Sequence, residues 1–186
     1  MSTLLLIRHA ETDLAGTFCG HADPPVNARG TAQIESLLNT LSQYSIAAIH
    51  TSDLLRAHTT AQAIAKNFTV PLYTSTTLRE INFGDWEALT WPQIEQRNSS
   101  YAKLWADQYP LLSAPNGEAF NDFESRVLSH IDTITSHNED AAIVTHAGVI
   151  RTAMTHRCNL STQQAWELTK NYCCVFDLTR KELVIQ

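Results

Sequence analysis

Short, continuous apolar runs alternate along the chain with segments in which apolar residues recur at helical spacing. The first run is Leu4 to Ile7, and two later runs are residues 46–50 (IAAIH) and 141–146 (AAIVTH). Runs of this length without alternation are typical of strands that are buried on both faces, as in a parallel sheet. We therefore expect three buried strands at these positions.

The segments between the runs have the pattern of amphipathic helices. Asn27 can cap a helix whose apolar residues lie between Ile34 and Leu41, and Ser52 or Asp53 can cap the helix after the second run. Residues 120–134 carry a third such pattern.

The last apolar stretch, CCVFDL at residues 173–178, predicts a final edge strand. Strands that alternate with helices favour an α/β fold, here a three-layer α/β/α sandwich with a mainly parallel sheet. A chain of 186 residues fits one such domain over residues 1–186.

Residues 78–118 interrupt the alternation and predict an insertion that covers the sheet as a lid. Six of the fifteen aromatic residues fall in this stretch. Packing of the insertion is the simplest role for them, but one or two could stack on an aromatic leaving group, and Trp86 is the first candidate.

Composition narrows the functional classes. The net charge of −6 and the lack of a basic run argue against a nucleic-acid binder. No apolar stretch approaches the roughly 20 residues that cross a bilayer, and the N-terminus does not resemble a signal peptide. The four cysteines show no disulfide framework, so reduced thiols in the cytoplasm are expected. The eight histidines show no metal-ligand spacing, and we expect no metal and no cofactor.

Charged and titratable residues follow each of the three predicted strands. The first strand ends in Arg8-His9, the second leads into a helix whose first turn holds Arg56, and the third ends in His146. Ligands of open α/β sheets collect beyond the carboxyl ends of the strands, so these side chains should converge. Arginine forks match phosphate oxygens, and a neutral imidazole can attack phosphorus.

A proton donor for a leaving alcohol is also needed, and Glu80 is the candidate, which must be protonated before the chemical step. Its alternative role is a salt bridge to Arg79. Glu11 and Glu87 are nearby carboxylates that could take its place.

Six segments together resemble the histidine phosphatase superfamily, the phosphoglycerate mutase-like proteins. They are LLLIRHAET, GHADPPVNARG, TSDLLRAHTTA, LREINFGDWE, PNGEAFNDFESRV and VTHAGVIR, in family order. The resemblance implies a metal-independent phosphatase with the phosphoglycerate mutase-like fold. It implies His9 as the phosphorylated nucleophile, Glu80 as proton donor, and a phosphate pocket of Arg8, Arg56 and His146, with Thr12 and Ala147 also contacting substrate.

Within the family, FCGHADPP and LREINFGDWE most resemble the α-ribazole-5′-phosphate phosphatases of cobalamin assembly. The chain departs from the usual pattern at Ala10 and Ala147, where glycine is common, and at Ala15, where many members have asparagine. The charged residues and the acid are retained, so we expect a modestly altered pocket.

The resulting hypothesis is a cytoplasmic phosphomonoesterase, monomeric or homodimeric, that acts on a small phosphate ester without nucleic-acid or membrane partners. A phosphoglycerate mutase or a sugar-phosphate phosphatase is the alternative enzyme. A non-catalytic module that binds a phosphorylated ligand is the alternative of another class.

Overall fold

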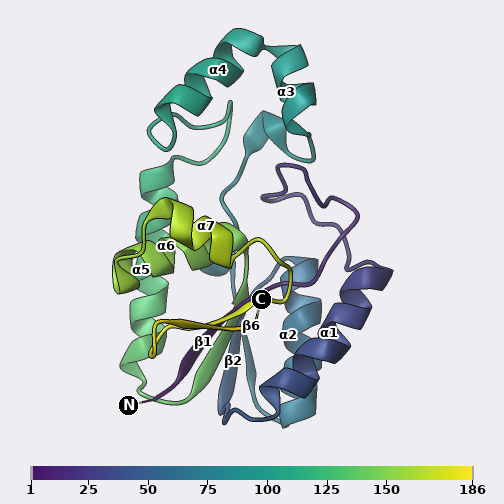
Figure 1. The fold of residues 1–186 in the computed structure, drawn as a ribbon, viewed down its shortest axis with the longest axis vertical. Helices are drawn as coiled ribbons and strands as arrows, with labels where there is room; N and C mark the ends of the chain where they lie inside the picture. The colour runs from purple at the N-terminus through teal and green to yellow at the C-terminus, as the bar shows by residue number, and fades with distance from the viewer. Residues whose placement is uncertain (1, 186) are drawn as a thin grey trace.

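The computed structural model describes residues 2–185, which form one mixed sheet with helices on both faces (Figure 1). The strands are β1 (Leu4–Arg8), β2 (Ala48–Ser52), β3 (Leu72–Ser75), β4 (Ala141–Thr145), β5 (Val175–Asp177) and β6 (Glu182–Ile185). The sheet order is β3-β2-β4-β1-β5-β6. The first four positions pair in parallel, while β5 and β6 are antiparallel. This confirms the predicted α/β class.

Two hydrophobic clusters attach the helices to the two faces of the sheet. The helices are α1 (Ala28–Leu41), α2 (Leu55–Phe68), α3 (Trp91–Arg97), α4 (Ser99–Gln108), α5 (Phe120–Ser136), α6 (Ala147–Cys158) and α7 (Thr162–Leu168). On one face, α1 and α2 pack against alternate residues of β1, including Leu5 and Ile7. On the other face, α5 and α6 pack against Leu4 and Leu6. The continuous apolar run of β1 is therefore buried on both sides, as its pattern indicates.

Several local expectations need correction. The second strand lies two residues later than the predicted run, and β5 is an interior strand because β6 covers its outer edge. Asn27 does cap α1, accepting a hydrogen bond from the Gly30 amide at 2.8 Å. Neither Ser52 nor Asp53 is the N-cap of α2, which is Leu54. Instead, Asp23 from a distant loop accepts a 2.7 Å hydrogen bond from the Leu55 amide.

Between β3 and α5 the chain leaves the sheet and forms α3 and α4 at one end of the molecule (Figure 1). We call residues 83–114 the lid segment. It begins with the short 3-10 helix Gly84–Trp86 and has a small core of its own, built around Trp86, Ile94 and Ala102. A first 3-10 helix, Thr76–Leu78, remains with the body, since Leu78 is fully buried in the main core. No helix among residues 2–185 is long and apolar enough to span a membrane.

Candidate active site

Four of the residues singled out in the sequence converge at the carboxyl edge of the parallel strands. β1 and β4 are adjacent and in register, with Arg8 opposite Thr145, so the residues that follow, His9 and His146, meet beyond the strand ends. Their ring centroids are 5.1 Å apart. Arg56 reaches the same place from the first turn of α2, and its Nε lies 3.2 Å from Nε2 of His9.

The hydrogen bonds of His9 define its tautomer. Nδ1 lies 2.7 Å from the carbonyl oxygen of Ala10, which can only accept, so Nδ1 carries the proton. Nε2 accepts from the Arg56 guanidinium at 3.2 Å and is therefore unprotonated, with its lone pair engaged in that hydrogen bond. Burial, followed by the charges of Arg56 and Arg8, holds the pKa of His9 well below 6.5. The ring is thus neutral at physiological pH and presents a nucleophilic nitrogen to the two arginines.

Arg56 is a fully buried cation without a carboxylate partner among the described residues. Nη1 donates to the carbonyl oxygen of Ala22 at 2.8 Å, and Nη2 donates to those of Cys19 and Gly20 at 3.2 and 2.7 Å. Carbonyl oxygens partly compensate for the lost hydration, but they leave the full positive charge in place. An arginine held in this way favours an anionic ligand.

Arg8 is oriented by the backbone on the opposite side of the site. Its Nη1 donates to the carbonyl oxygens of Thr169 and Lys170 at 2.8 and 2.7 Å. Its guanidinium lies 3.9 Å from the ring centroid of Tyr172, a cation–π contact. Nε of Arg8 is buried without a hydrogen-bond partner among residues 2–185.

His146 completes the cluster of buried nitrogen atoms. Neither of its ring nitrogens has a partner in the described part of the chain. Burial is the main cause that lowers the pKa of His146 well below 6.5, and the charge of Arg56 is the next. Buried polar atoms are rarely left unpaired. Together with Arg8 and Arg56, these atoms form a pocket rich in potential hydrogen-bond donors.

Glu80 is held against the first turn of α6, the helix that follows His146. Its Oε2 accepts from the Gly148 amide in the first turn of α6 at 2.9 Å, and its Oε1 accepts from the Ile81 amide at 3.1 Å. The Glu80 carbonyl oxygen is in turn bound by Arg126 at 3.1 Å. Arg79 does not pair with Glu80, because its guanidinium is engaged by Asp53 in a salt bridge. Two backbone amides thus fix the Glu80 carboxylate at the first turn of α6, whose N-cap residue is His146.

The other two candidate carboxylates have structural roles. Glu87 accepts backbone hydrogen bonds from Gly20, His21, Ala22 and Phe83 at 2.8–3.0 Å, which ties the loop around Arg56 to the lid segment. Glu11 is bound by Asn27 at 3.3 Å and lies 3.6 Å from Arg29. The structure therefore separates both from the cluster that contains Glu80.

The other residues that the sequence singled out, at positions 10, 12, 15 and 147, differ in burial and in their distance along the chain from the two histidines. Ala147 opens α6 directly after His146, and Ala10 is buried with its amide bound to the hydroxyl of Thr60 at 3.1 Å. Thr12 is buried and forms an isolated bridge with Val26. Ala15 is exposed, in a turn closed onto the Thr12 carbonyl, and its methyl group offers no hydrogen bond.

The expectation that Trp86 stacks on a leaving group does not fit its position. Only 5% of the residue is exposed. Its ring packs against four other aromatic rings at centroid distances of 5.1–6.4 Å, those of Phe18, Trp91, Tyr101 and Trp105. Trp86 thus belongs to the core of the lid segment, and we remove it from the candidate site.

Sequence reasoning missed several residues that shape the site. Tyr172 covers Arg8 and also lies 5.6 Å from His9, ring centroid to ring centroid. Thr60 bridges the Ala10 amide and the Arg56 carbonyl. Nothing in the local pattern around Tyr172 or Thr60 marks them, since both act through contacts with distant segments. Among residues 2–185, no group of three or more His, Cys, Asp or Glu side chains is arranged to hold a metal ion.

Comparison with known proteins identifies relatives of this chain. A family model described as the histidine phosphatase superfamily (branch 1) matches residues 4–183. The adenosylcobalamin/alpha-ribazole phosphatase of Escherichia coli (strain K12) is 28% identical over 184 residues, covering 96% of this chain and 91% of that protein.

Solved structures agree in fold over the whole chain. The alpha-ribazole phosphatase from Shigella flexneri superimposes with a TM-score of 0.84 at 27% identity, covering 99% of this chain and 94% of that one. Bacillus stearothermophilus YhfR superimposes with a TM-score of 0.82 at 30% identity, covering 100% of this chain and 95% of that one.

Proposed function

The chain belongs to the histidine phosphatase superfamily, and from this premise we propose that it hydrolyses a small phosphate monoester through a phosphohistidine on His9. The observation that carries the proposal is the tautomer of His9. Nδ1–H is held by the Ala10 carbonyl, and the unprotonated Nε2 accepts a hydrogen bond from the Arg56 guanidinium. When the phosphoryl oxygens of a substrate take over that guanidinium donor, the lone pair of Nε2 is released for attack on phosphorus.

The first chemical step transfers the phosphoryl group to the protein. Nε2 of His9 attacks phosphorus, the bond from phosphorus to the ester oxygen breaks, and that oxygen takes a proton from the Glu80 carboxyl group. Arg8, Arg56 and His146 donate hydrogen bonds to the phosphoryl oxygens as charge builds on them. Neutral His9 is required, and its burial beside two guanidinium groups supports that state.

The second step restores the enzyme. Glu80, now a carboxylate, removes a proton from a water molecule that attacks phosphorus. The bond between phosphorus and Nε2 breaks, its electron pair returns to His9, and inorganic phosphate leaves. The hydrogen bond from the Gly148 amide to Glu80 supports this role, because it fixes the carboxyl group where the leaving oxygen departs.

For the substrate we propose α-ribazole-5′-phosphate, converted to α-ribazole in cobalamin assembly. The relatives named above support this choice, since two of them carry that activity in their names. We further propose a cytoplasmic location, in keeping with four free cysteines, and a monomer or homodimer that sizing by light scattering can identify.

Rapid quenching of turnover with a ³²P-labelled substrate tests the mechanism. We expect a protein-bound label that is acid-labile and alkali-stable, absent from His9→Gln, with turnover of that variant reduced at least a thousandfold. An unlabelled wild type that turns over, or an active His9→Gln, would overturn the proposal.

A comparison of kcat/KM tests the substrate. The panel is α-ribazole-5′-phosphate, phosphoglycerates, fructose bisphosphate and nucleotide monophosphates. Preference for any of the last three would refute the substrate and leave the mechanism standing.

A further inference from the structure

Arg151 occupies a position beside the site that the proposed mechanism does not use. It lies in α6, three residues after Gly148, whose amide binds Glu80. Residues three apart on a helix share a face, so the Arg151 side chain projects from the face of α6 that binds Glu80. Burial is the largest cause that lowers the pKa of Arg151, whereas the charge of Glu80 raises it and that of Arg8 lowers it. Arg151 is therefore close enough to both residues to sense their charges.

The side chain of Arg151 is held in one orientation by two contacts. Its Nε donates to the hydroxyl of Thr169 at 2.8 Å, and its guanidinium lies 3.7 Å from the centroid of the Trp166 ring. Thr169 also supplies the carbonyl oxygen that orients Arg8, so the two arginines are positioned from the same residue. Fixing an arginine side chain costs conformational entropy. Because these two contacts already fix Arg151 in the folded protein, ligand binding does not have to supply that free energy.

The outer end of the Arg151 guanidinium is uncommitted. Within residues 2–185 it forms no salt bridge, and the bond from Nε is its only hydrogen bond. Two other arginines in partly buried positions are paired with carboxylates, Arg126 with Glu118 and Arg79 with Asp53. A fixed guanidinium with free Nη1 and Nη2 presents a planar fork for two oxygen atoms.

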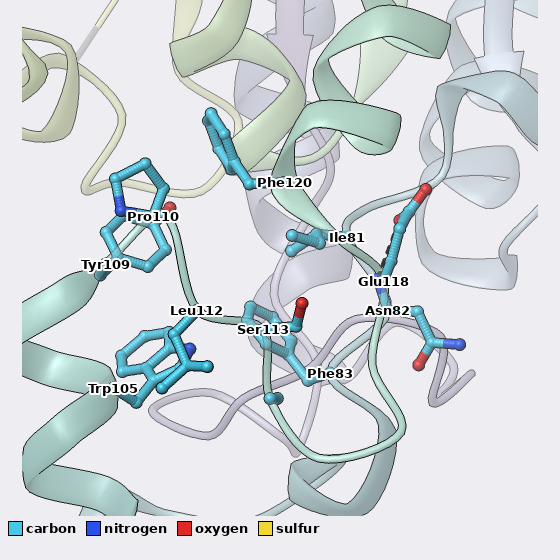
Figure 2. Close-up of a pocket in the computed structure, with 11 residues that line it drawn as sticks. Ile81, Asn82, Phe83, Trp105, Tyr109, Pro110, Leu112, Ser113, Glu118 and Phe120 are labelled. Atoms are coloured by element: carbon cyan, nitrogen blue, oxygen red, sulfur yellow. Dashed lines mark hydrogen bonds between the residues drawn. The ribbon is translucent and has the colours of Figure 1, made fainter.

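Tyr109 of the lid segment is near enough to Arg151 for the charge of each to act on the other's pKa. Burial raises the pKa of the Tyr109 phenol, and the charges of Glu80 and Arg151 act on it in opposite directions. The phenol therefore lies near both, although nearly half of the residue is exposed. Figure 2 shows Tyr109 and Trp105 on one side of a small cavity, with Ile81 and Glu118 on the other. Ile81 follows Glu80 directly, so this end of the lid segment meets the segment that carries the acid.

We propose that Arg151 is a specificity-determining residue that binds a pair of oxygen atoms in the leaving group of the substrate. The leaving oxygen departs at Glu80, and Arg151 and Tyr109 border the space around that carboxyl group. The chemical class is a leaving group with adjacent hydrogen-bond-accepting oxygens: the vicinal hydroxyls of a ribose or a carboxylate. This inference rests on the proposed function, since it names what the same site recognises beyond the phosphoryl group.

The test is kinetics of Arg151→Met and Arg151→Lys on three phosphate esters. They are α-ribazole-5′-phosphate, phosphoserine and phenyl phosphate, whose leaving group has no such oxygen pair. We expect Arg151→Met to lower kcat/KM about 10- to 100-fold, through KM, on whichever of the first two is the better wild-type substrate. A change of about twofold or less is expected on phenyl phosphate. Lysine keeps the charge but not the fork and should recover less than a tenth of the loss.

The 2′,3′-dideoxy form of α-ribazole-5′-phosphate separates the two oxygen sources. If Arg151 binds the ribose hydroxyls, wild type and Arg151→Met should hydrolyse this analogue equally well. If Arg151 binds a carboxylate, the loss of kcat/KM in the variant should be seen with phosphoserine instead. Either pattern supports the role of Arg151.

Arg157→Met is the matched control, because Arg157 lies in the same helix but is exposed and pairs with Asp132. It should leave all kinetic constants unchanged. Equal losses on all three esters in Arg151→Met, or no loss on any, would overturn the inference. No turnover of any ester by the wild type would instead refute the proposed function.

Discussion

Replacement of Gly148 by alanine should displace the proposed acid without unfolding the protein. A Cβ atom at this position would lie 2.1 Å from Oε1 of Glu80, 3.0 Å from its carboxyl carbon and 3.2 Å from its Oε2. Alanine is favoured over glycine within a helix by about 1 kcal/mol, so α6 has no reason to move. The carboxyl group is the end of a flexible side chain, and it is the part that must move away.

The size of the effect follows from the contact that is lost. The Glu80 carboxylate accepts a 2.9 Å hydrogen bond from the Gly148 amide. A hydrogen bond to a charged group contributes about 1.5–3 kcal/mol, which corresponds to a factor of about 10–150 in rate if it is needed in the transition state. General acid catalysis contributes about 10²–10⁴ in total. We expect Gly148→Ala to lower kcat/KM about 100-fold on an alkyl phosphate.

The assay compares two leaving groups and two backgrounds. On 4-nitrophenyl phosphate, whose weakly basic leaving group needs little protonation, kcat/KM should fall less than 10-fold; kcat/KM is compared because it reports only the steps up to phosphorylation of His9. In Glu80→Gln, the added Gly148→Ala change should cost nothing further on the alkyl ester, because the acid is already gone. Equal losses on both esters, or an additional loss in the Glu80→Gln background, would refute the reasoning, and unchanged thermal unfolding of Gly148→Ala is the folding control.

Three further predictions concern stability. His9 and His146 are buried and their pKa values are lowered, so below about pH 6.5 the unfolded chain binds more protons than the folded one. Because of this pair, the free energy of unfolding should fall by up to about 2.7 kcal/mol for each pH unit of acidification. Urea unfolding at a series of pH values measures this dependence. The slope of the unfolding free energy against pH should be smaller by about that amount in the double variant His9→Asn/His146→Asn. Equal slopes in the variant and the wild type would contradict the lowered pKa values of the two histidines. Glu87→Gln replaces one carboxylate oxygen by an amide NH2 group, which faces two of the four backbone donors, and should cost about 2 kcal/mol in urea unfolding. kcat/KM should also fall because the loop around Arg56 loosens, and full activity would argue against that coupling. Trp86→Ala should cost about 3–5 kcal/mol in urea unfolding while the ratio of kcat/KM between aromatic and aliphatic esters stays constant, and a selective loss on aromatic esters would restore its stacking role.

The convergence of these four side chains, those of Arg8, His9, Arg56 and His146, could be predicted because it depends on periodicity and strand direction. Arg8, His9 and His146 directly follow continuous apolar runs, and Arg56 lies in the first turn of a helix after another. Parallel strands present their carboxyl ends at one edge, so four residues that are distant in sequence could be placed together without knowledge of side-chain contacts. The same pattern predicted the α/β fold, although the antiparallel pairing of β5 and the edge position of β6 depend on neighbours that the pattern does not specify.

The orientation of each group could not be predicted from the sequence. Asp53 seemed suited to cap α2, yet it pairs with Arg79, and the cap comes from Asp23 across the site. Trp86 is close to Glu80 in sequence, yet its ring is enclosed by other rings of the lid segment.

The amino-acid order by itself determined which segments are buried and which charged residues stand at their ends, because burial periodicity is a local property of the chain. Only the tertiary structure decided which atom of His9 carries the proton and which guanidinium stays free. Those outcomes depend on single hydrogen bonds, such as that from Arg56 to His9 and that from Arg151 to Thr169. Such bonds form only where segments distant along the chain meet within about 3 Å, a condition that no local pattern encodes.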